Sequence, residues 1–255
     1  MKYIGVTGHR GSGKTATAYL LGNVLESIRW NHTKEQTQRE YNKCCEQIQT
    51  NNNAIYDCSL YYVYFDEFGD MPKYMVATLL GIDMSVLDND TLKDTMYVNF
   101  KDFKLYPYSK SYNLLTTTDI LNNSSKKWKD YYMSLREFAK CFSIDIMQKL
   151  FGTDVWLKTR KANDEKWGDT VSEWKIFSDV KTKDEIKYIK EKNGILIETI
   201  RLTNKKKNKG ISNIDESCEN DVDYVIITEG DLKNLFDKIY NIALEIYEKS
   251  NDNSV

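Results

Sequence analysis

The stretch Gly8-His-Arg-Gly-Ser-Gly-Lys-Thr15 follows a strand-like run, Lys2 to Thr7, and precedes a segment with the apolar spacing of a helix. Its glycines and its final Lys-Thr stand at the spacing G-x-x-x-x-G-K-[ST] that is typical of a triphosphate-binding loop. Glycine allows the backbone angles that turn successive N–H groups toward one anion, and the amides that open the following helix add to that field. The alternative is a chance glycine-rich turn, and the strand and helix on either side argue against it.

We expect this loop to bind ATP with Mg²⁺. The Lys14 ammonium can reach the β- and γ-phosphates, and the Thr15 hydroxyl can ligate the metal. The expected ATP-binding residues share the loop or open the helix: Gly8, Arg10, Gly11, Ser12, Gly13, Lys14, Thr15 and Ala16. Because ATPases, GTPases and kinases all use such a loop, the motif does not reveal the acceptor of the phosphoryl group.

Bulk composition limits the classes of protein to which this chain could belong. The 255 residues are 41% hydrophobic and 29% charged, which suits a buried core, and the formal net charge is −2. That balance argues against a general nucleic-acid or membrane coat, although it leaves room for a local basic patch. Five cysteines without a C-x-x-C pair, no membrane-length apolar run and no signal peptide together predict a cytoplasmic protein.

Five β-prone runs alternate with helical segments along the chain. This alternation predicts an α/β fold with a parallel sheet flanked by helices on both faces. The runs cover residues 2–7, 60–65, 174–180, 195–202 and 224–228. We expect one domain over residues 1–255, in which residues 88–132 are irregular, aromatic and polar. An acceptor-side insertion is expected over about 66–132 and a lid-like loop over about 203–218.

Two aspartates end β-prone runs. Asp179 ends the third run, and ligands of open α/β sheets lie at the carboxyl ends of strands, so Asp179 is a candidate to hold a water of Mg²⁺. The alternative is an ordinary aspartate that caps a turn. Asp66 ends the second run, where it either orients the acceptor, acts as a base or simply occupies a turn.

The remaining candidate site residues are several cations and one tryptophan. The lysine-rich residues 205–209, preceded by Arg201, are either a cationic lid over the phosphates or a solvated loop. Arg136 stands in the first turn of a predicted helix, where a cation is mildly unfavourable, so it either binds an anion or forms a surface salt bridge. Trp156 either stacks on a nucleobase or fills the core, and composition alone favours the core.

Several segments together resemble the bacteriophage deoxynucleoside monophosphate kinases. The match is patchy before residue 134, with Phe65 to Gly81 a weaker likeness to the family's acceptor side. The clearer segments are Gly8–Thr15, Ser134–Phe138, Phe151–Trp156, Phe177–Glu185 with Tyr188-Ile-Lys and Gly194-Ile195, and Asp223–Ile226 with Gly230 and Leu232–Leu235. The stretch Ser178-Asp-Val180 is the most telling of them.

The resemblance implies a P-loop three-layer sandwich of the adenylate-kinase type, with the five strands in the order 2-3-1-4-5. It implies transfer of the γ-phosphoryl group of ATP to a (deoxy)nucleoside monophosphate. The expected catalytic residues are Lys14, Asp179 and Arg201. Thr15 and Asp179 are the residues expected at the metal. The expected acceptor-binding residues are Asp66, Lys73, Arg136, Trp156 and Lys181. The family usually has arginine at the position of Lys181, and lysine keeps the charge but loses the bidentate fork.

Other functions stay open at this point. A kinase for another small acceptor, such as dephospho-coenzyme A or a nucleoside, uses the same loop. A non-catalytic nucleotide-binding protein would also carry it, since fold does not imply function. We expect no stable nucleic-acid partner and no membrane, we leave a homodimer open, and for a phage-encoded protein the compartment would be the host cytoplasm.

Overall fold

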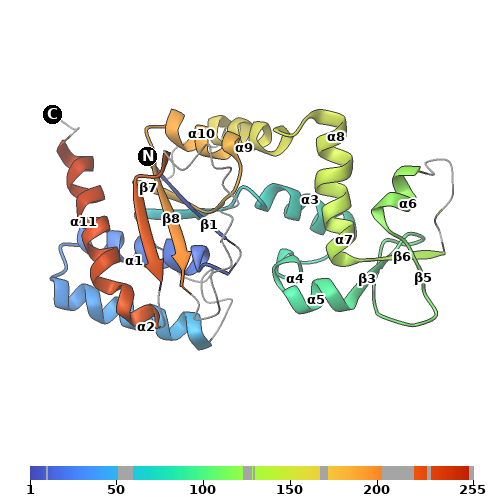
Figure 1. Cartoon of the computed structure of the whole chain (residues 1–255), viewed down its shortest axis with the longest axis horizontal. Coiled ribbons are helices and arrows are strands. Elements are labelled where there is room, and N and C mark those ends of the chain that lie inside the picture. Colours follow the sequence, from blue (N-terminus) through green and yellow to red (C-terminus); the bar gives the residue numbers. More distant parts are fainter. Residues whose placement is uncertain are drawn as a thin grey trace. The chain divides into compact units, whose positions relative to one another are not determined.

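The computed structural model describes residues 1–9, 11–50, 60–122, 128, 130–166, 172–202, 221–228 and 231–252. The chain divides into two compact units (Figure 1). The first comprises Met1–Phe68 and Trp167–Val255, and the second comprises Gly69–Lys166. The second unit therefore interrupts the first, and it extends well beyond residue 132, where the expected insertion ends.

A five-stranded, all-parallel sheet forms the centre of the first unit. Its strands are β1 (Lys2–Gly8), β2 (Val63–Asp66), β7 (Trp174–Val180), β8 (Ile195–Arg201) and β9 (Tyr224–Thr228). All five lie in the β-prone runs of the sequence, so the predicted α/β class is confirmed. The strand order is β2-β7-β1-β8-β9. The expected order, 2-3-1-4-5, numbered only five strands along the chain. The observed order differs from it because β3 to β6 of the second unit also precede β7 in the sequence.

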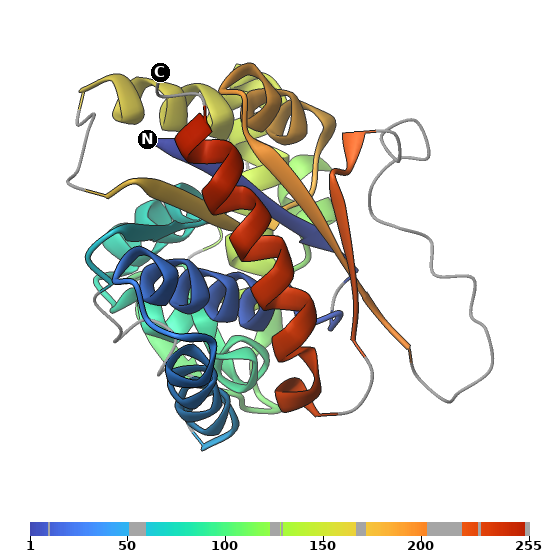
Figure 2. The same cartoon turned by 90° about the vertical axis from the view of Figure 1, so that its left-hand side faces the viewer.

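Helices cover both faces of this sheet because residues along a strand point alternately to the two sides. Ile4 and Val6 of β1 are fully buried in a core with α1 (Lys14–Arg29) and α11 (Phe236–Asp252). In Figure 2, α11 lies across the strands. Tyr3 points the other way and packs edge-to-face on Tyr188 of α10 (Lys183–Glu191) at 5.9 Å. Helix α10 begins with a capping box in which Thr182 and Glu185 exchange hydrogen bonds.

The remaining helices of the first unit extend the core around α1. They are α2 (Lys34–Thr50) and the 3-10 helix η3 (Leu232–Leu235). Tyr41 of α2 is fully buried against Phe236 at 5.2 Å between ring centroids, and its hydroxyl donates to the carbonyl of Leu232 at 2.7 Å. None of the described helices is long and apolar enough to cross a membrane.

The second unit has its own core and its own sheet. It opens with helices α3 (Asp70–Leu80), α4 (Met84–Asp88) and α5 (Asp90–Thr95). The sheet order is β4-β3-β6-β5, with antiparallel pairs except β5 beside β6. The strands and the helix between them are β3 (Met96–Asn99), β4 (Leu105–Pro107), β5 (Asn113–Leu114), α6 (Thr117–Asn122) and β6 (Tyr131–Ser134).

A helical run then closes the second unit. It consists of α7 (Leu135–Lys140), the π-helix η1 (Cys141–Ile146), α8 (Met147–Phe151) and α9 (Val155–Lys166). The Ser134 side chain caps α7 by accepting from the Glu137 amide. The expectation that residues 88–132 are irregular was wrong, because strands of two to four residues are too short to show a readable alternation.

Candidate phosphate-binding site

The turn between β1 and α1 is built on glycines in the left-handed region of backbone space. The φ angles are 137° at Gly8, 80° at Gly11 and 94° at Gly13. A side chain at Gly8 would also place its Cβ 2.3 Å from the carbonyl oxygen of Thr199 on β8, so only glycine fits there. Arg10, expected to bind ATP, lies outside the described residues. The glycines of the motif therefore allow the backbone conformation that the sequence predicts for this turn.

Lys14 is the first residue of α1, and its side chain folds back over the turn. Its Nζ donates to the carbonyl oxygens of Gly8 and His9, both at 2.8 Å. Burial lowers the pKa of Lys14, the nearby Lys181 ammonium lowers it further, and Asp179 opposes the shift. A partly desolvated ammonium beside a second cation would gain from an anion placed between them.

The start of α1 offers nothing that competes with such an anion. Its N-cap residue, Gly13, makes no side-chain cap, and the first turn holds no acidic residue. Thr15 and Ala16, which open the helix, are half-buried. The first amides of a helix lack partners within the helix and carry its positive dipole end, so they are available to a phosphate group.

Buried hydroxyls attach the turn to the neighbouring strands. Ser12 Oγ is hydrogen-bonded to Thr199 Oγ1 at 2.7 Å, and the Thr199 hydroxyl donates to the carbonyl of Thr7 at 3.1 Å. Thr228 on β9 donates to the Ser12 carbonyl at 3.4 Å. The sequence analysis missed both threonines, since nothing in a β-prone run separates them from ordinary buried strand residues. They hold the turn against β8 and β9.

Asp179 and Lys181 lie at the end of β7, on the same edge as the turn. One carboxylate oxygen of Asp179 accepts the Phe68 amide at 2.7 Å, and the other lies 3.4 Å from Lys181 Nζ. Glu185 accepts the amides of Lys181 and Thr182, and burial raises its pKa. The first unit thus brings three of the expected residues, Lys14, Asp179 and Lys181, into one electrostatic cluster.

Asp66 is the last residue of β2 and is buried, which does not fit the alternative of a plain turn residue. It is 4% exposed and forms an ion pair at 3.0 Å with Lys175, which is 5% exposed. One Asp66 oxygen also accepts the amide of Glu67, whose own carboxylate accepts the Ser178 hydroxyl at 3.0 Å. Sequence reasoning missed Lys175, although a lysine inside the apolar strand Trp174–Val180 is itself a signal that a buried partner exists.

Three expected acceptor-binding residues belong to the second unit, where each is engaged by neighbours. Arg136 pairs with Asp90 and Asp94 of α5. Lys73 pairs with Asp88 at 2.8 Å. The Trp156 indole donates to the carbonyl of Ser143 in the π-helix at 2.8 Å, so this half-buried ring is fixed by its polar edge. The anion that the position of Arg136 predicts is present as two carboxylates of its own unit.

Arg201 ends β8 and is exposed, opposite Thr228 in the sheet register. The lysine-rich segment 205–209 and the expected lid over 203–218 lie outside the described residues. Within the described part of the chain, no group of three or more His, Cys, Asp or Glu residues is arranged to hold a metal ion. A divalent cation here would depend on Thr15, Asp179 and oxygens of its own phosphate ligand.

Comparison of the chain with models of known protein families and with the sequences of curated proteins finds no match. The likeness to the phage kinases therefore stands on the motifs quoted above.

Proposed function

We propose that this chain is a P-loop phosphotransferase of the adenylate-kinase type, which moves the γ-phosphoryl group of ATP to a (deoxy)nucleoside monophosphate. The observation that carries the proposal is the turn between β1 and α1. Its three glycines have the positive φ angles that let successive main-chain amides turn toward one anion, and the Lys14 ammonium donates to two carbonyls of the same turn. These contacts are readily exchanged for phosphate oxygens, which are stronger partners for an ammonium.

In this proposal, the position of each group of the chain decides its role. The turn amides and Lys14 bind the triphosphate, and Thr15 at the start of α1 faces the same ligand. Mg²⁺ fits this donor set, since a hydroxyl, an Asp179 carboxylate oxygen and phosphate oxygens are the hard ligands that it takes. When bound, it neutralises charge on the phosphates. Little covalent chemistry is needed, because positioning and charge neutralisation supply most of the rate in phosphoryl transfer.

Lys181 is the best-supported residue for the acceptor phosphate. Its ammonium is 56% exposed, lies beside Asp179 and lowers the pKa of Lys14, so it belongs to the same electropositive edge. Asp66 instead supports the end of β2 through its buried pair with Lys175. Arg136 would have to leave two carboxylates to bind an acceptor, so we place it second to Lys181.

A kinase is favoured over a simple triphosphatase by the point at which the second unit leaves the first. That unit starts at Gly69, directly after Phe68, whose amide is bonded to Asp179 at the carboxyl edge of the sheet. Ligands of open α/β sheets bind at this edge. The chain therefore leaves the first unit next to a residue of the edge where such ligands bind, which is where an acceptor-binding insertion would be joined to the sheet.

The test measures ATP binding by calorimetry and ADP release in a coupled assay with a panel of deoxynucleoside and ribonucleoside monophosphates. We expect ATP to bind with Mg²⁺ and ADP release to require one or more of the monophosphates. A panel widened to nucleosides and dephospho-coenzyme A identifies a different acceptor. ATP binding without any acceptor-dependent turnover would contradict the kinase and leave a nucleotide-binding protein. Absence of ATP binding would contradict the whole proposal.

A further inference from the structure

One face of the second sheet carries a row of tyrosine rings. Val98 of β3 and Met133 of β6 are fully buried on the face that meets the unit's core. Their strand neighbours point to the other side, where Tyr97 stands opposite Tyr106 and Asn99 stands opposite Tyr132. We call the rings on this side the tyrosine face: Tyr97, Tyr106, Tyr108, Tyr112 and Tyr132.

The rings of the tyrosine face contact each other in sequence. Centroid distances are 5.3 Å from Tyr108 to Tyr97 and 6.3 Å from Tyr97 to Tyr112. Tyr112 stacks on Tyr132 at 3.7 Å and 2°, and Tyr106 stands nearly perpendicular to Tyr132 at 6.0 Å. Tyr108 is 53% exposed and the others are half-buried. A contiguous aromatic surface directed away from the core is a feature of binding sites.

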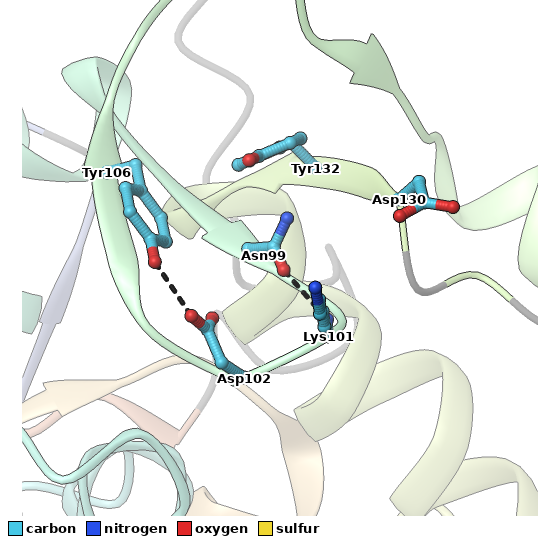
Figure 3. Close-up of a pocket in the computed structure, with 6 residues that line it drawn as sticks. All are labelled: Asn99, Lys101, Asp102, Tyr106, Asp130 and Tyr132. Carbon is cyan, nitrogen blue, oxygen red and sulfur yellow. Dashed lines mark hydrogen bonds between the residues drawn. The ribbon is translucent and has the colours of Figure 1, made fainter.

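A pocket of about 370 Å³ opens beside the tyrosine face (Figure 3). It is lined by Asn99, Lys101, Asp102, Tyr106, Asp130 and Tyr132. The Tyr106 hydroxyl donates to Asp102 at 2.7 Å, which fixes that ring, and the Tyr112 stack fixes the Tyr132 ring. Both aromatic walls are therefore held in place before any ligand arrives, which reduces the entropy lost on binding.

Asn99 supplies the polar group that points to a ligand. Its side chain is 6% exposed, and its Oδ1 accepts the Lys101 amide at 2.8 Å. Its Nδ2 donors have no protein partner among the described residues, and Figure 3 shows this nitrogen turned away from Lys101, on the side of the Tyr132 ring. Because this nitrogen belongs to a residue that lines the pocket, it is available to donate to a ligand acceptor such as a base carbonyl. Asp130 supplies an acceptor in the same pocket.

Cations beside the tyrosine face are unpaired, in contrast to others of the same unit. Lys101, Lys104 and Lys110 are exposed and make no ion pair with any described residue. Lys93 and Arg136, by comparison, both pair with Asp90. Lys101 lines the pocket, and Lys104 and Lys110 lie within two residues of the tyrosines along the chain. These three ammonium groups outnumber the two carboxylates of the pocket, Asp102 and Asp130, and so favour a polyanion with exposed bases.

We propose that the tyrosine face binds single-stranded nucleic acid, with one base in the pocket against Tyr132 and Tyr106 and the backbone on the three lysines. Bases of a single strand can stack on aromatic side chains, whereas those of a duplex are hidden in its own stack. A strand suits this surface better than a lone nucleotide, because the rings continue from the pocket to Tyr108. The net charge of −2 describes the whole chain and does not exclude this local site. The proposal departs from the expectation of no stable nucleic-acid partner.

The test uses fluorescence anisotropy of a labelled mixed-sequence DNA strand of about twelve nucleotides with the full chain. Unlabelled strand, the matching duplex and free mononucleotides serve as competitors. We expect the unlabelled strand to compete best. We also expect affinity to fall as salt rises, with a log–log slope of about −2 for three lysine contacts. Competition by mononucleotide or duplex equal to that by the strand would overturn the proposal, as would the absence of binding.

Two variants locate the site, with unfolding followed by circular dichroism. Tyr108→Ser removes an exposed ring and should weaken binding about tenfold with little effect on stability. Asn99→Asp replaces the free donor by an acceptor and should weaken binding further. Lys149→Ala, an exposed lysine of α8, is the control and should leave binding unchanged. Equal loss in Tyr108→Ser and in the control, or none in either, would contradict the assignment.

Discussion

The two sheets of this chain form their candidate binding sites in different ways. Helices pack on both faces of the parallel sheet of the first unit, where Ile4 is buried on one side and Phe177 contacts Tyr188 of α10 on the other, and ligands of such sheets bind at the carboxyl edge. The sheet of the second unit buries Val98 and Met133 on one face and shows tyrosine rings on the other. The first site is therefore built mostly from main-chain groups at strand ends. The second is built from side chains that project from strand centres.

The difference decides which changes each site can tolerate. A main-chain site depends on backbone angles and on the few side chains that hold strand ends in place. A side-chain site depends on the individual rings and amides, while its backbone can remain intact. The predictions below test this contrast, beginning with the largest effect.

Lys14→Ala should lower phosphoryl transfer about a thousandfold, because the variant loses a preorganised cation at the phosphates. Its stability should change little, since among the described residues the Lys14 ammonium donates only to the exchangeable carbonyls of Gly8 and His9. The coupled assay measures the rate, and thermal unfolding measures the stability. Lys187→Ala, an exposed lysine of α10, is the control. Turnover by Lys14→Ala close to that of the unmodified chain would show that the turn does not bind the transferred group.

Lys175→Met should destabilise the first unit by about 3 kcal/mol, because it leaves the buried Asp66 carboxylate without its cation. The double variant Asp66→Asn with Lys175→Met removes both charges and should recover much of that loss. Urea denaturation of the single and double variants measures the coupling between them. If the double variant is as unstable as the sum of the single variants, the pair is not coupled and the end of β2 is held by other contacts.

Lys14 and Lys175 show what the sequence could and could not reveal. Lys14 belongs to a local motif, whose spacing alone predicts the glycine-built turn that the structure has. Lys175 depends on a partner more than a hundred residues away in the chain, and a single sequence does not state which carboxylate meets it. The same limit applies to Thr199 and Thr228, which support the turn only after the strands have paired.

The sequence was informative about the first sheet and poor about the second for a related reason. Each parallel strand is an apolar run of four to seven residues, long enough to be recognised. The strands of the second sheet have two to four residues and are joined by polar turns, so their tyrosines resemble an irregular segment. Which residues face the core there is fixed by register, for example Tyr97 opposite Tyr106, and register is a tertiary property.

Gly8→Ala should destabilise the first unit by about 2 kcal/mol, because its Cβ would meet the Thr199 carbonyl and its φ of 137° disfavours a side chain. Gly11→Ala is the matched control. It has a φ of 80° but nothing within 4 Å of the added Cβ, so only about 1 kcal/mol of strain is expected. Denaturant unfolding separates the two variants. Equal losses would mean that close approach to β8 does not constrain the turn.

The smallest effect is expected at the surface cluster of Asp90, Asp94 and Arg136 in the second unit. Hydrogen bonds from Lys93 and Arg136 lower the pKa of Asp90 to about 2. Because this value lies below the ordinary range near 4, the stabilisation is complete above about pH 4 and is lost as pH falls toward 2. The Asp90 side chain is 62% exposed, so solvent screening limits its contribution to about 0.5 kcal/mol.

Asp90→Asn should therefore be slightly less stable than the unmodified chain at pH 5, and the difference should shrink as the pH approaches 2. Urea unfolding across this range measures it, with Glu248→Gln, an exposed carboxylate of α11, as the control. A difference that grows toward acid pH would reverse the sign of the linkage. A loss of unfolding free energy well above 1 kcal/mol would show that this cluster is important for the stability of the second unit. Arg136 would then be a structural residue, and the acceptor phosphate would be left to Lys181.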